Sequence, residues 1–276
     1  MFKKVKILLF NIFQNLLKIL PPKYSCTLSN IRQTVMGRNI RFSYKKELDL
    51  FKVQSDNLTM YFNEKMRGLN TYSYGIKERA LSLAETYSLN LVEFSDNDVI
   101  IDCGANYGDL YAWTLVNKIK LNYISFEPSP IEFKCIQLNC EGQQNNNIAL
   151  SDSKGQFYFY VKSATGDSSL IEPAGGYEKK INTKTITLDS YLENYKIQEI
   201  KFFKLEAEGF EPEILQGSIN SIKKIKYIGV DGSPERGKNK EWTIDFAKNF
   251  LIKNGFDLIS LKSNNFFAKA LFKNKN

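Results

Sequence analysis

The sequence contains no histidine among its 276 residues. This absence excludes Ser-His-Asp triads, histidine-based zinc sites and histidine general bases. Any proton transfer must therefore use a carboxylate, a lysine, a tyrosine or water. Cysteine is scarce too, and the four cysteines form neither a CxxC pair nor a zinc-finger spacing. We interpret them as free thiols in a reducing compartment.

Long apolar runs are also missing. The N-terminal stretch 1–20, MFKKVKILLFNIFQNLLKIL, carries polar side chains in its middle, which makes it a poor membrane span. It also lacks the small-residue cleavage site of a signal peptide. We therefore expect a cytoplasmic protein.

The same stretch has the period of an amphipathic helix, and two prolines at 21 and 22 would end it. Its basic residues are Lys3, Lys4, Lys6 and Lys18. Two roles are open for a basic helix over 1–22. One is binding to an anionic membrane surface, at the inner face of the cytoplasmic membrane. The other is packing on its own domain or on a second subunit of a homodimer.

Positive charge is confined to the N-terminal part. The net charge is +8, and residues 1–50 hold ten Lys or Arg against two acids. The remaining chain is therefore neutral, whereas nucleic-acid binding needs clustered positive charge. The NPPY motif of amino-group methyltransferases is also absent from the fourth strand of the main domain. We expect no nucleic-acid partner.

From residue 76 onward, patterns of strands and helices alternate, which favours an α/β fold with a parallel sheet and helices on both faces. We predict a first helix over 76–92 and, among the later segments, strands over 98–104, 122–128, 145–152, 200–209 and 226–233. Segments 256–262 and 266–273 predict a C-terminal hairpin. The expected domains are the helix 1–22, an N-terminal substrate-side layer over 23–75, irregular with short strands, and a main domain over 76–276.

The first predicted strand of the main domain ends in a glycine turn, VIIDCGANYG. In such sheets this turn lies against the ligand. A diphosphate-binding turn needs Gly at i, i+2 and i+5, but Gly104 is followed by Asn106 at i+2 and Asp109 at i+5. An acid at the helix start would repel a diphosphate. The spacing therefore disfavours an NAD-dependent oxidoreductase.

The second strand of the main domain ends in SFEP. Glu127 lies 25 residues after Asp102, which suits an acid that holds ribose hydroxyls. A nucleoside without a diphosphate, held by a glycine turn and an acid, indicates S-adenosylmethionine.

The blocks VIIDCGANYG, SFEPSPIEFKCIQLNC, NNNIALSD and FFKLEAEGFEPEILQGS resemble successive motifs of the FkbM family of S-adenosylmethionine-dependent methyltransferases. The resemblance implies a Rossmann-like class I methyltransferase fold with a seven-stranded, mostly parallel sheet. It also implies O-methylation of a hydroxyl, often on a sugar or natural product. The implied cofactor residues are Asp102, Gly104, Asn106, Tyr107, Gly108, the ribose acid Glu127, and Ala149 and Asp152 beside the adenine. One block departs from the family, which commonly has KIDVEG where this chain has KLEAEG.

The block KLEAEG supplies the candidate catalytic residues. Strand periodicity places Lys204, Glu206 and Glu208 on one face, where unpaired charges would be costly in a packed core. We predict Glu208 as the general base, Glu206 near the cofactor's methionine end or the acceptor, and Lys204 as their charge partner. Alternatively, these acids hold a divalent metal, with Asp231 as a third ligand. The acids at 211 and 213 are interpreted as ordinary helix-start residues.

After the next strand, GSPERGKN resembles a phosphate loop only in its glycine spacing, so we assign Asp231 and Arg236 to acceptor contacts instead. The polar segment 153–185 has the composition of a loop over a site. The predicted function is O-methylation of a sugar in a bacterial glycan or glycoconjugate. The alternatives are methylation of a small-molecule natural product, NAD-dependent oxidation, and a non-enzymatic protein that binds the cofactor.

Overall fold

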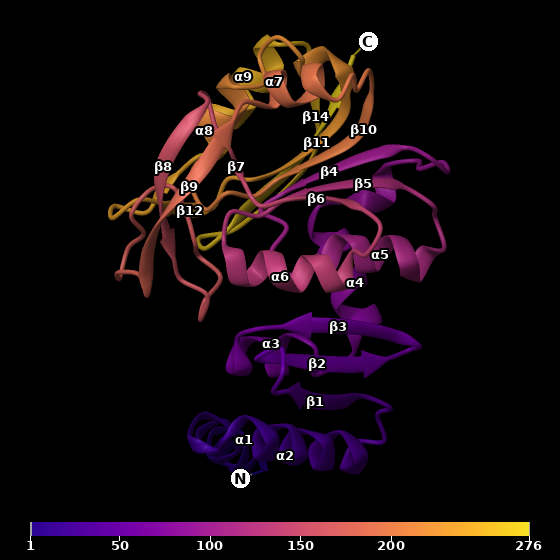
Figure 1. Cartoon of the computed structure of the whole chain (residues 1–276), viewed down its shortest axis with the longest axis vertical. Coiled ribbons are helices and arrows are strands. Elements are labelled where there is room, and N and C mark those ends of the chain that lie inside the picture. The colour runs from indigo at the N-terminus through magenta and orange to yellow at the C-terminus, as the bar shows by residue number, and fades with distance from the viewer. Residues whose placement is uncertain (1, 276) are drawn as a thin grey trace. The chain divides into compact units, whose positions relative to one another are not determined.

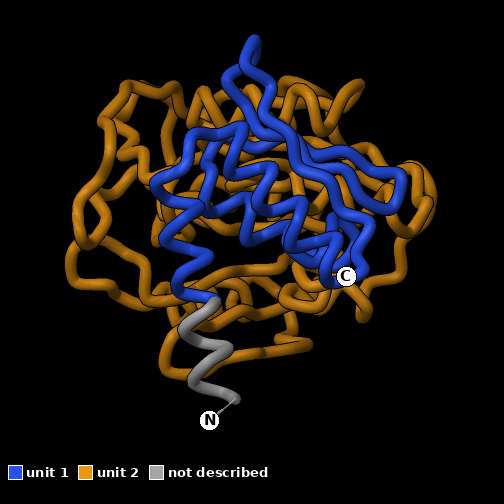
Figure 2. The backbone as a smooth tube through the Cα atoms, turned by 90° about the horizontal axis from the view of Figure 1, so that it is seen from below, with its two compact units in different colours: residues 1–79 blue, residues 80–276 orange. Residues whose placement is uncertain are grey.

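The computed structural model describes residues 2–275, and their side chains from residue 10 onward. The expectation for Lys3, Lys4 and Lys6 therefore lies outside the described side chains. The chain divides into two compact units, residues 1–79 and 80–276, shown in different colours in Figure 2. We call them unit 1 and unit 2. No helix in the described part of the chain is both long and apolar enough to cross a membrane.

Unit 1 begins with two helices, α1 (Phe2–Ile19) and α2 (Pro22–Val35). Three antiparallel strands follow, β1 (Arg41–Lys45), β2 (Leu50–Ser55) and β3 (Leu58–Phe62), and then the short helix α3 (Lys65–Thr71). The short strands were expected, but the irregular start of the 23–75 layer was wrong, because 22–35 is helical. Pro22 lies in the first turn of α2, where a missing N–H costs nothing.

Unit 2 is built on a seven-stranded sheet in the order β14-β15-β11-β10-β4-β5-β6 (Figure 1). β15 runs antiparallel to both neighbours, and the other pairs of neighbours are parallel. The predicted class I fold and its C-terminal hairpin are therefore confirmed. The strands are β4 (Val99–Cys103), β5 (Asn122–Phe126), β6 (Gln144–Asn146), β10 (Ile200–Leu205), β11 (Ile225–Asp231), β14 (Phe256–Ser263) and β15 (Ala268–Asn274).

Helices cover both faces of this sheet. α5 (Asp109–Asn117) and α6 (Pro130–Asn139) lie on one face, and α7 (Leu188–Asn194), α8 (Glu211–Gln216) and α9 (Ile244–Lys253) lie on the other (Figure 1). The helix predicted over 76–92 is shorter: α4 is Ile76–Thr86, and the 3₁₀ turn η1 is Leu89–Leu91. α8 ends at Gln216, the next residue Gly217 packs directly on the backbone of Ser151, and the 3₁₀ turn η2 (Ile222–Lys224) follows.

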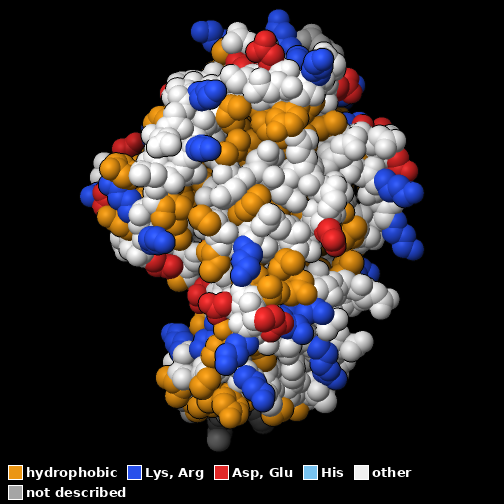
Figure 3. Space-filling model, in the orientation of Figure 1, with side chains coloured by type: hydrophobic (Ala, Val, Ile, Leu, Met, Phe, Trp, Pro, Cys, Tyr) orange, Lys and Arg blue, Asp and Glu red, His pale blue; other side chains and the backbone are white. Residues whose placement is uncertain are grey.

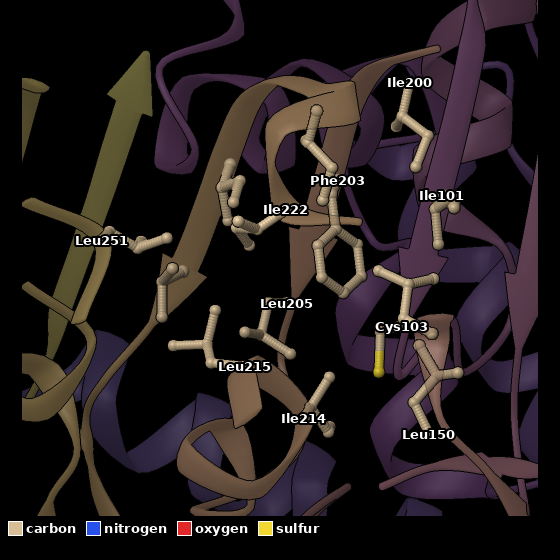
Figure 4. Close-up of a cluster of buried hydrophobic side chains, with 14 of the residues drawn as sticks. Ile101, Cys103, Leu150, Ile200, Phe203, Leu205, Ile214, Leu215, Ile222 and Leu251 are labelled. Atoms are coloured by element: carbon tan, nitrogen blue, oxygen red, sulfur yellow. The ribbon is translucent and has the colours of Figure 1, made fainter. Parts of the chain in front are cut away.

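The main core lies between the sheet and the α7–α9 layer (Figure 4). Ile101 and Cys103 of β4 and Phe203 and Leu205 of β10 belong to this cluster. Side chains alternate along a strand, so the residues between them point to the opposite face. At the carboxyl ends of these strands those intervening residues are charged.

A second, three-stranded sheet, β7-β9-β8, stands beside the main one and consists of β7 (Ala149–Leu150), β8 (Gly155–Val161) and β9 (Lys179–Ile186). The single strand predicted over 145–152 was wrong. β6 ends at Asn146 in the main sheet and β7 pairs with β9, because Asn147 turns away and its amide donates to the backbone oxygens of Glu127 and Pro128. A small hairpin joins β12 (Pro234–Arg236) and β13 (Glu241–Trp242).

Candidate functional site

The turn after β4 has a left-handed backbone at three positions. Gly104, Asn106 and Gly108 have φ angles of 73°, 52° and 83°. A Cβ at Gly104 would lie 1.9 Å from the backbone oxygen of Glu206, and one at Gly108 would lie 2.5 Å from the sulfur of Cys140. Glycine is required here first for packing, because the turn is pressed against the end of β10 and the end of α6.

Glu127 lies directly after β5 and supports this turn. Its carboxylate accepts the backbone N–H groups of Asn106 and Ser129, each at 2.9 Å. Burial, together with the carboxylate of Glu132, raises the pKa of Glu127 to about 8. The side-chain oxygen of Asn106 is buried and has no hydrogen-bond partner in the described part of the chain. The backbone of Asn106 is thus bound by the buried acid Glu127, and its side chain supplies an unsatisfied acceptor.

Sheet register joins Asp102 and Lys204. They are directly opposite each other on the parallel strands β4 and β10, and both are almost fully buried. The ammonium of Lys204 is 2.9 Å from Asp102 and 2.8 Å from Glu206. The hydroxyl of Tyr123 donates to the other oxygen of Asp102 at 2.5 Å. The carboxylate of Asp102 therefore has its partners within the protein, at the end of the strand that leads into the glycine turn.

The charges continue across the sheet with alternating sign. Asp231 of β11 and Lys269 of β15 are also register partners and form an ion pair, and Lys269 contacts Glu206 at 3.1 Å. Burial alone would raise the pKa of Glu206, but Lys204 and Lys269 hold it well below its usual range. We call Asp102, Lys204, Glu206, Lys269 and Asp231 the charge row. Lys269 was not among the residues predicted for the site.

Glu208 lies outside the charge row. β10 ends at Leu205, so Glu208 is not on the strand face predicted for it, and its backbone is left-handed with a φ of 51°. One of its carboxylate oxygens is buried and has no hydrogen-bond partner in the described part of the chain. Burial raises the pKa of Glu208 well above its usual range, and the carboxylates of Glu235 and Glu206 raise it further.

Glu235 is close enough to Glu208 to raise its pKa, because the β12 strand packs on the turn after β10. A Cβ at Gly209 would lie 2.3 Å from the Cα of Arg236, so the two backbones touch. Glu235 also has a buried carboxylate oxygen without a partner in the described part of the chain. Burial, with Asp231 next, raises the pKa of Glu235 to about 8. We call Glu208 and Glu235 the carboxyl pair.

The acids at the start of α8 hold this turn in place, which differs from their predicted role as ordinary helix-start residues. Glu211, 1% exposed, accepts the backbone N–H groups of Ala207 and Gly209 and the hydroxyl of Thr243. Glu213 forms a two-pronged ion pair with Arg236 at 2.7 and 2.9 Å. The sequence signal for these two acids was their position at a turn and a helix start, which Gly209 and Pro212 mark.

Arg236 and Asp231, predicted as acceptor contacts, are both engaged within the protein. Arg236 uses its two terminal nitrogens on Glu213 and on the backbone oxygen of Gly209. Asp231 binds Lys269 and Ser233. The segment 153–185 does reach this region, since the hydroxyl of Ser169 donates to the backbone oxygen of Glu208 at 2.9 Å.

The remaining predicted cofactor residues lie around the same edge of unit 2. Tyr107 is buried in the glycine turn, and its backbone oxygen accepts the amide of Asn139 at 2.7 Å. Ala149 is buried in β7. Asp152 is exposed and accepts the hydroxyls of Ser151 and Ser153. Among residues 2–275, no cluster of three or more acids or cysteines has the arrangement of a metal site.

Comparison with known proteins gives this arrangement a family. The model of the FkbM methyltransferase domain matches residues 102–258. The hexuronic acid methyltransferase AglP of Haloferax volcanii is 28% identical over 152 residues, which are 52% of this chain and 59% of that protein. The 2-O-methyltransferase NoeI of Sinorhizobium fredii is 22% identical over 186 residues, which are 60% of this chain and 76% of that protein. The match to AglP thus spans about three fifths of its length.

Solved structures are more distant. Fibrillarin of Methanococcus jannaschii has a TM-score of 0.46 at 11% identity, covering 87% of this chain and 99% of its own. M. capricolum TrmK, solved with S-adenosyl-homocysteine, has a TM-score of 0.41 at 13% identity, covering 71% of this chain and 68% of its own. The family assignment does not depend on them, since the family model alone covers more than half of the chain. This chain belongs to the FkbM methyltransferase domain family, whose cofactor is S-adenosylmethionine.

Proposed function

We propose that the protein is an S-adenosylmethionine-dependent O-methyltransferase that acts on a sugar hydroxyl. The observation that carries the proposal is the pairing of two carboxylates with opposite environments at the end of β10. Glu206 is kept ionised by two lysines, whereas Glu208 is buried beside another carboxylate. Groups whose pKa values are driven apart in this way are typical of acid–base sites.

The residues at the glycine turn fit the cofactor. Glu127 is a buried acceptor at the end of β5, suited to the ribose hydroxyls, and the unsatisfied side-chain oxygen of Asn106 offers a second acceptor. Glu206, one residue beyond β10 and pressed on Gly104, supplies negative charge on the side suited to the cofactor's cationic methionine end. When bound, the cofactor supplies an electrophilic methyl group.

Glu208 is assigned the role of base. A hydroxyl becomes a good nucleophile as its proton leaves, and a carboxylate with a raised pKa holds that proton better than an ordinary one. The unpartnered oxygen of Glu208 gives the acceptor hydroxyl a place to donate its hydrogen bond. Glu211 and Arg236 act as positioning residues, since Glu211 binds the backbone N–H groups on both sides of Glu208 and Arg236 binds the backbone oxygen of the residue that follows it.

The name of one relative favours a sugar as the acceptor over another natural product, and the name of the other favours transfer to oxygen. AglP is named for a hexuronic acid and NoeI for 2-O-methylation. Glu235 also fits a sugar acceptor, because its unpartnered carboxylate oxygen can accept a hydrogen bond from a neighbouring hydroxyl of a polyol.

Calorimetry with S-adenosylmethionine, compared with NAD, tests the cofactor. We expect S-adenosylmethionine to bind and NAD not to bind. Glu127→Ala should weaken the binding of S-adenosylmethionine by roughly tenfold or more, because it removes the acceptor for the ribose hydroxyls and leaves the backbone N–H groups of Asn106 and Ser129 without this partner. Glu193→Ala, an exposed position on α7, serves as the matched control. Binding of NAD in place of S-adenosylmethionine would overturn the proposal.

The reaction itself is read by mass spectrometry of neutral, amino and acidic sugars incubated with enzyme and cofactor. The expected product is a sugar with one added methyl on oxygen, formed together with S-adenosylhomocysteine. Transfer to a non-sugar hydroxyl compound, with every sugar left unchanged, would contradict the sugar assignment and keep the methyltransferase.

A further inference from the structure

The second helix of unit 1 has its polar and apolar sides reversed. Its buried residues are Ser25, Cys26, Ser29 and Gln33. A helix at the surface of a water-soluble domain normally buries an apolar stripe and exposes polar residues. α2 does the opposite over much of its length.

The outward side of α2 is apolar. Tyr24, Ile31 and Val35 are 61%, 57% and 82% exposed, and their spacing of seven and four residues places them on one helix face. Leu28, partly exposed, lies between them on the same face. In α1 an equivalent stripe of exposed residues consists of Ile12, Leu16 and Ile19. We call these residues the α1–α2 apolar surface.

The reversal is fixed by specific contacts on the inner side. The side chain of Asn30 exchanges two hydrogen bonds with the backbone of Phe42 in β1, at 2.8 and 2.9 Å. The hydroxyl of Ser25 donates to backbone oxygens at the α1–α2 corner, and Gln14 of α1 exchanges hydrogen bonds with Asn70. The polar side chains thus attach the helices to unit 1. Turning α2 over to bury the apolar stripe would break these bonds.

The two helices are also held to each other. The guanidinium of Arg32 in α2 lies over the rings of Phe13 and Phe10 in α1, at 4.9 and 6.0 Å from their centres. Such contacts are favourable and orient the helices. The apolar surface is therefore a feature of a defined two-helix layer.

Charge identifies what would cover this surface. Unit 1 contains 15 Lys or Arg against 5 acids, whereas unit 2 contains 23 against 25. Lys18 and Lys23 are exposed beside the α1–α2 corner, and Figure 3 shows lysine and arginine interspersed with hydrophobic side chains over these helices. A second copy would bring two strongly positive units together, which is unfavourable. Apolar residues flanked by lysines match the interface of an anionic bilayer.

We propose that the α1–α2 apolar surface binds the interface of membranes that contain anionic lipid. Ile31, Val35, Ile19 and Leu16 enter the acyl boundary, Tyr24 lies at the headgroup level, and Lys18 and Lys23 contact lipid phosphates. The surface involves residues of unit 1 alone, so the proposal stands independently of the proposed methyl transfer.

Vesicle flotation with the full chain tests this. We expect the protein to float with vesicles of phosphatidylcholine and phosphatidylglycerol, and to stay unbound with phosphatidylcholine alone. Ile31→Asp/Val35→Asp should reduce the bound fraction by roughly tenfold or more, because it removes apolar insertion and adds like charge to the lipid surface. The matched control is Ile259→Asp/Leu261→Asp, on similarly exposed residues of β14, which should float like the unmodified protein.

Circular dichroism of each variant checks that the fold is retained. A third variant, Lys18→Gln/Lys23→Gln, keeps the apolar surface and should weaken binding by roughly tenfold or more through lost headgroup attraction. Failure of the unmodified chain to float with anionic vesicles overturns the proposal, as does equal flotation of Ile31→Asp/Val35→Asp. Sedimentation velocity that shows a dimer dissociated by this same variant, without vesicle binding, assigns the surface to a second copy instead.

Discussion

Glu206 and Glu208 are two residues apart and have opposite environments. Glu206 lies between Lys204 and Lys269, at 2.8 and 3.1 Å, and its pKa is held well below its usual range despite burial. Glu208 has a buried oxygen without a partner in the described part of the chain and a carboxylate neighbour in Glu235. Two glutamates of one short loop thus have opposite pKa shifts, which suits Glu206 to the role of a fixed anion and Glu208 to the proposed role of a proton acceptor.

The difference arises from where β10 ends. Glu206 directly follows the last strand residue, Leu205, so it stays close to Lys204 of the same strand and to Lys269 of β15. Beyond it, Glu208 adopts a left-handed backbone and leaves the row of lysines. A non-glycine residue in this conformation costs of the order of 1–3 kcal/mol, which the bonds of Glu211 to the loop offset. In the proposed function, the charge row serves structure and cofactor binding, and the carboxyl pair serves the chemistry.

Removing the ionisable group of Glu208 is expected to have the largest effect. Glu208→Gln keeps the size of the side chain but cannot accept a proton, so turnover should fall roughly 10²–10⁴-fold, the usual contribution of a general base. Thermal stability should hold or rise, because an amide is easier to bury than a carboxylate. Single-turnover methylation and thermal unfolding measure the two effects.

Glu193→Gln provides the control for this variant, since it makes the same change at an exposed position of α7. It should turn over normally. Full turnover by Glu208→Gln with unchanged cofactor binding would remove Glu208 from the chemistry, and the base would have to be sought in Glu235.

Breaking the charge row should cost stability instead. Lys204→Met leaves the buried carboxylate of Asp102 without its cation, and loss of one partner of a buried ion pair costs about 3–5 kcal/mol. We expect the free energy of unfolding to fall by about this amount, with the loss measured by urea denaturation at neutral pH.

The matched control is Lys226→Met on the adjacent strand β11. Its ion pair with Glu199 has a similar length of 3.2 Å, but both side chains are exposed. Such pairs contribute about 0–1 kcal/mol. Equal losses from the two variants would show that the charge row adds nothing beyond a surface contact.

The sequence predicted those parts of the site that local pattern determines. The alternation of strands and helices along the chain, the glycine turn and the acid after β5 follow from pattern and motif spacing. Lys204, Glu206 and Glu208 were predicted as site residues from the block KLEAEG. Lys269 could not be found, because its position opposite Asp231 depends on the register of the C-terminal hairpin. Nothing local in AKALFK distinguishes it from the other lysine of β15, Lys273.

Two errors have a common physical cause, which is that polar residues were assumed to face water. The polar residues of α2 hold that helix to unit 1, so its pattern resembled a loop. Glu211 looked like an ordinary helix-start acid but is fully buried, where it binds two backbone N–H groups. Binary patterning cannot identify polar groups that are buried because the folded chain supplies them with hydrogen-bond partners.

The smallest expected effect, and the sharpest test of the comparison, is a shift in pH dependence. Glu208 must be ionised to act as base, so activity should rise with pH. The carboxylates that raise its pKa are Glu235 first, then Glu206, Asp167 and Asp231. Glu235→Gln removes the strongest of these charges. The pKa of Glu208 should therefore fall, and the rising limb of log kcat/KM should move to lower pH.

Glu235 itself has a pKa of about 8, so it carries the charge that the variant removes only near and above that pH. The unmodified enzyme and Glu235→Gln should therefore differ most near and above pH 8, where the variant is the more active of the two per enzyme. A role in folding alone would lower activity equally at all pH values and leave the limb in place. Glu172→Gln is the control, because it also removes a carboxylate near this region but one that forms an exposed pair with Lys238. A limb that moves to higher pH in Glu235→Gln would mean that Glu235 donates a hydrogen bond to ionised Glu208. The two acids would then share one proton, and the carboxyl pair, rather than Glu208 alone, would be the base.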